Sequence, residues 1–306
     1  MLDVRRLRIL AEFADLGTVA ATAEALHLSG PAVSQQLAAL EKEAGVLLLE
    51  KRGRTLHLTN AGLRLVDHAR VLLGNLAAAE ADLASLRQHP SGEVRIAAFP
   101  TAARTLIARL WPAPHNDSPR ITLLEAEPDA AEAALRQHRA DIALTHSYSL
   151  LPRPVPPGCE QRHLTDEPVL LVIHPDDAAA HGLQPGRPAD LSRLADAAWL
   201  LPGPETACHE MTQRACGAAG FVPRAVAVAS DFAVLAALTA RRAGVALIPR
   251  LALPTPTPDI SAFPLVSPLH RSIQAVYRAG TGTHPDIRFV IEHLVAAAPT
   301  PSPEPV

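Results

Sequence analysis

The sequence predicts an α/β protein that carries an N-terminal all-α unit with a helix-turn-helix. Three observations support this prediction. Residues 20–45 have the pattern of two helices joined by a glycine turn, residues 59–88 keep one helical period, and strand-like runs alternate with helical stretches from Gly92 onward. Such alternation is typical of a sheet with helices on both faces. No period of 20–50 residues repeats, which argues against a solenoid.

Composition narrows the class of protein further. The chain has 306 residues, of which 48% are hydrophobic, so it is long enough for two or three domains and too apolar to be disordered throughout. Its three cysteines are too few for a secreted disulfide scaffold. We find no apolar run of about 18–20 residues and no signal-peptide core. We therefore expect a soluble cytoplasmic protein.

The second helix of residues 20–45 has the character of a DNA-reading helix. Ser29 can cap it, Pro31 suits its first turn, and Val33, Leu37 and Leu40 form its buried stripe. This spacing leaves short polar or small side chains near the exposed N-terminal turns: Ala32, Ser34, Gln35 and Gln36. Hydroxyl and amide groups of this kind can read base edges in the major groove. From the pattern alone, a two-helix packing unit is an equally good interpretation.

A basic segment follows these helices. Lys51, Arg52 and Arg54 surround Gly53, and residues 56–58 have a strand-like pattern. This combination predicts a small wing that holds phosphate. The chain as a whole carries a formal net charge of −3, which excludes a globally basic coat for nucleic acid.

The helix predicted for residues 59–88 carries a heptad seam. Its apolar positions are spaced alternately by four and three residues: Leu65, Ala69, Leu72, Leu76, Ala79, Leu83 and Leu86. An amphipathic helix packed on its own domain is one explanation. A seam maintained over three heptads between two domains favours pairing with a second copy.

Beyond residues 89–92, which break the helix, the remaining elements follow in alternating order. The predicted strands are 94–98, 121–125, 141–145, 168–174, 225–229, 245–248 and 273–277. The predicted helices are 101–110, 130–137, 232–241 and 286–297. The tail at 299–306 is rich in proline, and we expect it to be disordered.

The N-terminal residues also resemble a known family. The segments 13–26, 29–37 and 58–62, together with Leu40, Glu41 and Gly45, closely resemble the winged helix-turn-helix of LysR-type transcriptional regulators. Looser similarity extends to residue 297. The resemblance implies a DNA-binding domain at 1–58, a dimerisation helix at 59–88 and an effector domain at 92–297. It implies two Rossmann-like subdomains of periplasmic-binding-protein type, the first at 92–164 and 267–297, the second at 165–266.

Functional residues follow from the same resemblance. It implies operator DNA contacts by Ser29, Pro31, Ala32, Ser34, Gln35, Gln36, Lys51, Arg52, Arg54 and Thr59. It implies a small-molecule effector, a carboxylate or an amino acid, at Pro100, Thr101, Ala102, Thr145, His146, Pro202, Gly203, Ser230 and Phe232. For Thr101 and Ser230 a helix cap is the structural alternative, and for His146 the alternative is a solvated side chain. Homodimers and homotetramers are expected, without membrane contact.

Other function classes have weaker support. We find no nucleotide-binding, hydrolase or CxxC motif, and His209-Glu210 begins a zinc motif that Gln213 does not complete. We therefore expect no enzyme activity, no metal and no cofactor. A freestanding solute-binding protein would lack residues 1–88. A redox sensor that uses Cys208 and Cys216 is the remaining alternative; it needs a thiolate of lowered pKa.

Overall fold

The N-terminal unit is a winged helix-turn-helix. A computed structural model describes residues 1–53, 55–85, 92–111, 118–253 and 259–299. The unit contains α1 (Val4–Leu16), α2 (Val19–Ala25), α3 (Gly30–Ala44), β1 (Leu49–Arg52) and β2 (Thr55–Leu58). Val33, Leu37 and Leu40 are buried in one core with α1, which confirms the stripe predicted for α3. The antiparallel pairing of β1 with β2 confirms the wing.

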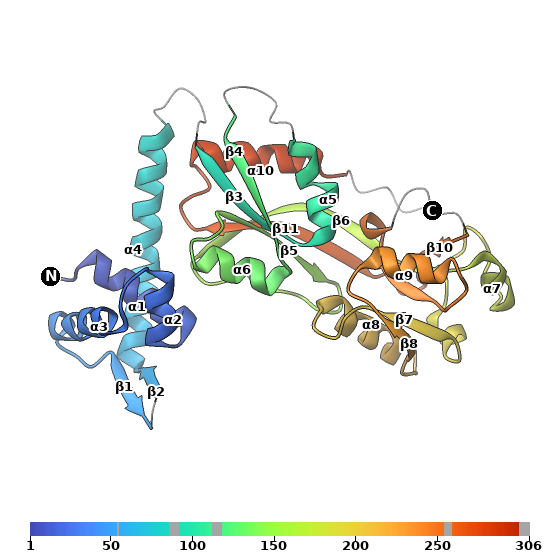
Figure 1. Cartoon of the computed structure of the whole chain (residues 1–306), viewed down its shortest axis with the longest axis horizontal. Helices are drawn as coiled ribbons and strands as arrows, with labels where there is room; N and C mark the ends of the chain where they lie inside the picture. Colours follow the sequence, from blue (N-terminus) through green and yellow to red (C-terminus); the bar gives the residue numbers. More distant parts are fainter. Residues whose placement is uncertain (54, 86–91, 112–117, 254–258, 300–306) are drawn as a thin grey trace.

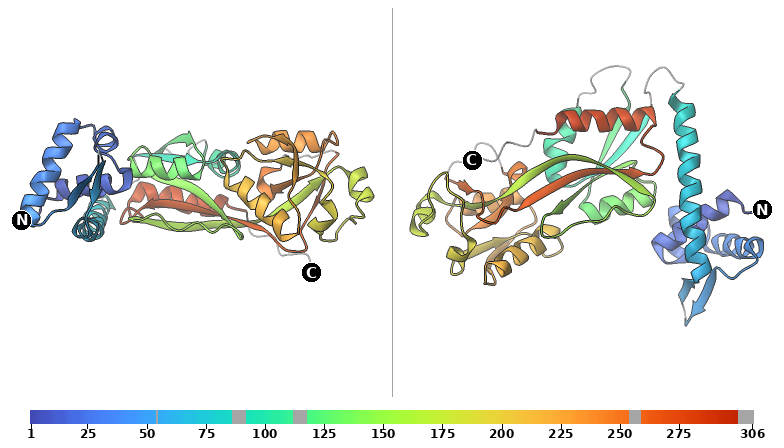
Figure 2. Two further views of the ribbon diagram at one scale, coloured as in Figure 1. Left: turned by 90° about the horizontal axis from the view of Figure 1, so that it is seen from below. Right: turned by 180° about the vertical axis from the view of Figure 1, so that it is seen from behind.

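One long helix connects this unit to the rest of the chain. Helix α4 (Asn60–Ser85) starts beside the wing and runs between the helix-turn-helix and the α/β domain (Figures 1 and 2). Thr59 secures its start, because its hydroxyl accepts the Gly62 N–H (3.1 Å) and donates to the Leu47 carbonyl (2.8 Å). No helix among the described residues is long and apolar enough to cross a membrane.

The α/β domain is built on a mixed sheet. Its strands lie in the order β10 (Ser261–Phe263), β6 (Cys159–Ile173), β11 (His270–Arg278), β5 (Ile142–Tyr148), β3 (Glu93–Ala98) and β4 (Arg120–Glu125), and β9 (Ala246–Pro249) also pairs with β6. A parallel pair, β7 (Ala198–Leu201) and β8 (Arg224–Val228), lies outside this sheet. Strands β6 and β11 run side by side along the domain (Figure 2).

The sheet beside α4 is covered on both faces, as the alternation predicts. Along β3, Val94, Ile96 and Ala98 face a core with α5 (Pro100–Thr105), a short 3₁₀ turn (Ile107–Leu110) and α10 (Pro285–Ala297). Ala97 faces the opposite core, which α6 (Pro128–Arg136) covers. This period of two is the signature of a strand buried on both faces. We call this half of the domain the proximal lobe.

The other half, which we call the distal lobe, surrounds the far end of β6. Val169, Leu171 and Ile173 pack in a core with α7 (Pro175–Ala180), a 3₁₀ turn (Leu191–Leu194) and α8 (Ala207–Ala218). Val172 faces a second core with α9 (Phe232–Thr239) and a 3₁₀ turn (Arg250–Ala252). Strand β6 is continuous through both lobes, so the expected subdomain boundary at residue 164 lies inside a strand.

Most predicted elements are present, with two systematic differences. The predicted helix 101–110 is divided into α5 and a 3₁₀ turn. The predicted strand 168–174 is only the buried end of β6, which begins at Cys159. The exposed first part of β6 is polar, with Glu160, Gln161 and Arg162 in sequence, and therefore lacks the apolar run that predicts a buried strand.

Candidate DNA-binding surface and effector site

The N-terminal turn of α3 presents the expected reading residues, with one exception. Ser34 and Gln35 are exposed, and Ser29 caps the helix by accepting the Ala32 N–H (3.3 Å). Gln36 is half-buried, because its amide oxygen accepts a hydrogen bond from Arg6 Nε (3.0 Å). Gln36 therefore fixes α1 against α3, whereas Ser34 and Gln35 are free to contact a ligand.

The wing supplies the positive charge beside this helix. Lys51 is exposed, and Arg52 is exposed although it forms an ion pair with Glu50 (2.5 Å). Such a surface pair is weak, so the guanidinium can exchange its partner for a phosphate. Arg54 lies outside the described residues. Thr59 contributes its hydroxyl to the start of α4 rather than to a free surface.

The seam of α4 is divided between two environments. Ala69 is fully buried and Leu65 packs on the same core, so the first part of the seam belongs to the helix-turn-helix unit. Further along, Leu72, Leu76 and Leu83 are 49%, 46% and 69% exposed. Leu86 lies outside the described residues. Among the described residues, no other part of the chain covers these exposed leucines. They form an apolar stripe, and such stripes mark interaction surfaces.

A buried polar cluster lies where β5, β6 and β11 approach the distal lobe. Arg271 is 1% exposed and its Nε donates to Glu167 Oε1 (2.8 Å), while Glu167 Oε2 accepts the Leu251 N–H (2.6 Å). Burial opposes the charged guanidinium, but Glu167, Tyr148 and Cys208 together raise the pKa of Arg271. The guanidinium lies 5.2 Å from the centre of the Phe99 ring.

His146 belongs to this cluster and is not solvated. Its ring meets Phe99 and Tyr148 edge-on, with centroids 4.6 and 5.2 Å away, and its Nδ1 is buried without a hydrogen bond among the described residues. Burial lowers the pKa of His146 to about 4, although Glu127, at 3.9 Å, opposes the shift. His146 is therefore neutral at physiological pH. The alternative of a solvated side chain is wrong, because His146 is only 5% exposed.

The other expected effector residues lie just after β3, β7 and β8, except Thr145, which lies within β5. In the proximal lobe, Thr101 and Ala102 are buried in α5, while Pro100 is exposed. Thr145 is buried next to His146 within β5, which extends to Tyr148 and not only to residue 145. The residues of α5 and those of β5 therefore flank Phe99.

In the distal lobe, Pro202 and Gly203 are buried directly after β7. Ser230 donates to Glu205 Oε1 (2.8 Å), and a Cβ at Gly203 would lie 2.5 Å from Ser230 Oγ. Asp231, not Ser230, caps α9, which leaves the Ser230 hydroxyl outside the cap. Phe232 is half-buried in the first turn of α9. Ser230 and Gly203 are thus brought together around Glu205, a residue that sequence reasoning missed.

The cysteines are free and lie in environments that suppress their reactivity. Cys208 and Cys216 are buried on α8. Eight residues of helix separate them by about 12 Å along the axis, too far for a disulfide while the helix persists. Burial raises the pKa of the Cys208 thiol to about 11 and that of Cys216 to about 12.

Comparison with known proteins agrees with this architecture. Residues 4–63 match the model of the bacterial regulatory helix-turn-helix proteins of the lysR family, and residues 87–299 match the LysR substrate-binding domain. The nitrogen assimilation regulatory protein nac of Escherichia coli is 30% identical over 254 residues, which cover 82% of this chain and 79% of that protein. The dual regulator OxyR of the same organism is 26% identical over 289 residues, which cover 92% of this chain and 90% of that protein.

Solved structures show the same fold. A full-length OxyR variant from Pseudomonas aeruginosa has a TM-score of 0.61 at 22% identity, covering 97% of this chain and 94% of that one. ArgP from Mycobacterium tuberculosis has the same TM-score at 20% identity and covers 97% of each chain. The chain combines a winged helix-turn-helix, a connecting helix and a two-lobed domain in the family's order. It belongs to the LysR family of transcriptional regulators.

Proposed function

We propose that this regulator binds operator DNA through the exposed start of α3 and the wing, as a dimer joined by α4. The observation that carries the proposal is that Ser34 and Gln35 on α3 and Lys51 and Arg52 in the wing of the same unit are all exposed. Hydroxyl and amide groups supply base contacts, and the basic wing supplies phosphate contacts. Full-length CbnR, 25% identical to this chain, has been solved with its target DNA.

The test of operator reading uses an operator selected from random DNA with the purified full-length protein. Ser34→Ala combined with Gln35→Ala should reduce the preference for this operator over unrelated DNA about tenfold or more, because a good base contact contributes about 1–3 kcal/mol of discrimination. Lys42→Ala, in the last turn of the same helix, is the matched control. Undiminished preference in a competition gel shift would refute the assignment of α3.

We propose that the exposed leucines of α4 form the dimer contact. Replacing Leu72 and Leu76 by Lys should convert the dimer to a monomer in sedimentation velocity, because two exposed leucines per helix that the proposed dimer buries are exchanged for charges. Leu63, which is 51% exposed on the same helix but outside the seam, provides the control Leu63→Lys. We further propose a tetramer formed through the effector domains.

We infer that the effector binds between the two lobes, at Pro100, Thr101, Ala102, Thr145, His146, Pro202, Gly203, Ser230 and Phe232. An amino acid fits these groups better than a dicarboxylate. On the proximal side, Arg271 pairs with Glu167 but keeps a buried Nη2 that makes no hydrogen bond among the described residues, and Glu205, beside Ser230, gives the distal side a carboxylate. A zwitterion can complement both signs, whereas a second carboxylate would meet Glu205.

A thermal-shift screen tests this inference. At a concentration about one hundred times its dissociation constant, an effector stabilises the protein by about 2.7 kcal/mol, which corresponds to several degrees in melting temperature. At least one amino acid should produce such a shift, and Glu205→Gln should reduce it. A shift with dicarboxylates that Glu205→Gln increases would contradict the choice of a zwitterion.

A further inference from the structure

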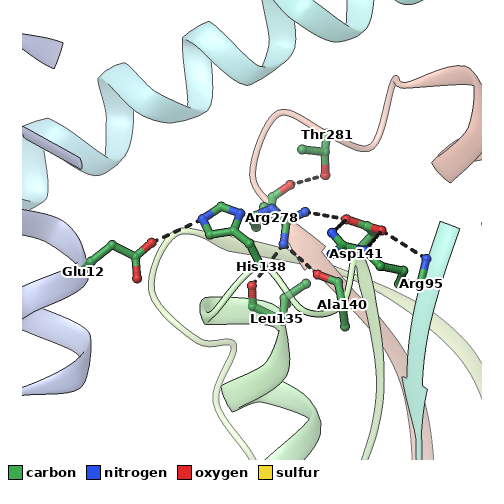
Figure 3. Close-up of polar contacts among 8 residues, drawn as sticks. All are labelled: Glu12, Arg95, Leu135, His138, Ala140, Asp141, Arg278 and Thr281. Atoms are coloured by element: carbon green, nitrogen blue, oxygen red, sulfur yellow. Dashed lines mark hydrogen bonds and ion pairs between the residues drawn. The ribbon is translucent and has the colours of Figure 1, made fainter. Parts of the chain in front are cut away.

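The DNA-binding unit touches the effector domain of its own chain through an acidic surface on α1. Glu12 is 7% exposed, and its carboxylate lies 3.2 Å from Nε2 of His138, which follows α6 in the proximal lobe (Figure 3). Asp15, one turn further along α1, lies within electrostatic range of Arg136 on α6. Burial raises the pKa of Asp15, although Arg70 and Arg136 oppose it. Acidic groups on one unit thus face basic groups on the other.

The turn that carries His138 is held in an unusual backbone conformation. His138 has φ of 53°, a left-handed conformation that costs a non-glycine residue about 1–2 kcal/mol. Arg278, at the end of β11, clamps both sides of the turn, because its Nη1 donates to the carbonyls of Leu135 (3.0 Å) and Ala140 (2.8 Å) (Figure 3). Strain of this kind persists only where the surroundings enforce it.

Arg278 is fixed in turn by Asp141. Its Nη2 donates to Asp141 Oδ1 (2.9 Å), which also accepts Nη2 of Arg95 (2.9 Å), while Asp141 Oδ2 accepts Nε and the backbone N–H of Arg95 (both 3.0 Å). Burial opposes the charged carboxylate, but the hydrogen bonds from Arg95 prevail and lower the pKa of Asp141. The position of His138 is thus set by a network anchored in β3, β5 and β11.

A second contact lies along α4. The turn after β11 approaches α4 so closely that a Cβ at Gly280 would lie 2.1 Å from the Gly74 carbonyl oxygen. Gly280 also has φ of +81°. At Gly158 a Cβ would lie 3.7 Å from Cγ of Arg70, whose guanidinium pairs with Asp15 (2.6 Å). Three turns of the proximal lobe therefore rest on α1 and α4.

These contacts are discrete rather than part of one continuous core. A cavity of about 400 Å³ remains between α4 and the proximal lobe, and Arg95, Asp141 and Arg278 line one wall. The strands behind this wall, β5 and β11, lead to Tyr148 and Arg271, which pair in register at the buried polar cluster. A few contacts next to a cavity can be released without unfolding either unit.

We propose that Glu12–His138 and Gly74–Gly280 form a latch that fixes the DNA-binding unit on the effector domain of its own chain. The latch transmits changes at the buried polar cluster to α1 through β5 and β11, a part of the proposal that rests on effector binding between the lobes. Release of the latch changes the orientation of the DNA-binding unit and leaves both units folded.

The first test measures the radius of gyration of the full-length protein by small-angle X-ray scattering, without DNA or effector. His138→Asn and Gly280→Ala should each increase the radius of gyration. Asparagine is chosen at position 138 because it tolerates the left-handed backbone. His27→Asn (φ 54°) and Gly186→Ala (φ +77°, with nothing within 4 Å of the added Cβ) place the same changes at comparable backbone conformations away from the contact. The two controls should superimpose on the wild type. Profiles of His138→Asn and Gly280→Ala that also superimpose on it would overturn the latch.

The second test compares operator affinity with and without an effector found by thermal shift. His138→Asn should retain operator selectivity and the thermal shift. The ratio of the operator affinities with and without effector should fall toward one. An undiminished ratio would overturn transmission through the latch. If the wild type shows no effector response, the proposal of effector binding fails, and the scattering experiment still decides whether the latch exists.

Discussion

The start of α3 and the buried polar cluster hold their polar groups in opposite environments. In the N-terminal unit, no Asp, Glu, Lys or Arg lies between Ala25 and Leu40, and Ser34 and Gln35 are exposed. In the effector domain, His146, Glu167 and Arg271 are almost fully buried. Exposed polar groups cost the fold little and are free to exchange partners. Buried ones must be paired internally, so their chemistry and the stability of the fold are inseparable.

The largest expected effect breaks the buried pair. Arg271→Met leaves the Glu167 carboxylate buried without its cation and should lower the free energy of unfolding by about 3–5 kcal/mol. Urea denaturation followed by tryptophan fluorescence measures the decrease, because Trp199 is buried in the distal lobe.

Two controls test whether burial is the cause. Arg52→Ala breaks the exposed pair with Glu50 and should cost less than about 1 kcal/mol. Arg271→Met combined with Glu167→Gln should recover part of the stability, because the uncompensated charge is removed. Equal decreases for the buried and the exposed pair would contradict the comparison.

The same contrast explains what the sequence could predict. The capping serine at position 29 and the stripe of Val33, Leu37 and Leu40 are set within a few residues of each other, so local pattern sufficed. Arg271 meets Glu167 and Tyr148 only through strand pairing over more than 100 positions, and no local signal marks it. His146 was found by resemblance, but its burial depends on Phe99 and β11. Residues 160–163 are not predicted as a strand, because that part of β6 is polar and exposed.

The second prediction concerns His146 and pH. The unfolded chain binds a proton at this histidine below a pH of about 6.5, whereas the folded protein has a pKa of about 4. The unfolded state therefore binds more protons between these two pH values. The free energy of unfolding falls as the pH falls, by about 3 kcal/mol over the whole window. Urea titrations at pH 7 and pH 4.5 should show a smaller difference for His146→Gln than for the wild type. His57→Gln, at an exposed position in the wing, should leave the difference unchanged.

A smaller effect is expected on the exposed side of the comparison. Lys51→Ala removes a proposed phosphate contact without affecting the core, because Lys51 is exposed. The slope of log K against log salt concentration should decrease by about 0.9 for each phosphate that the variant no longer neutralises, for the selected operator and unrelated DNA alike. Fluorescence anisotropy at several salt concentrations measures the slope. An unchanged slope would show that Lys51 does not bind the DNA backbone.

The smallest effect is expected at Cys208 and Cys216. With a pKa of about 11, roughly one Cys208 side chain in several thousand is ionised at pH 7.5, and the thiolate is the reactive form. Peroxide should therefore leave operator affinity unchanged in the wild type, and Cys208→Ala and Cys216→Ala should behave in the same way. A peroxide response that either substitution abolishes would establish the redox alternative. If both substitutions abolish the response, a disulfide between the two cysteines is implied, and α8 would have to unwind, because about 12 Å of helix separates the two thiols. If only one abolishes it, oxidation of that single thiol to the sulfenic acid accounts for the response.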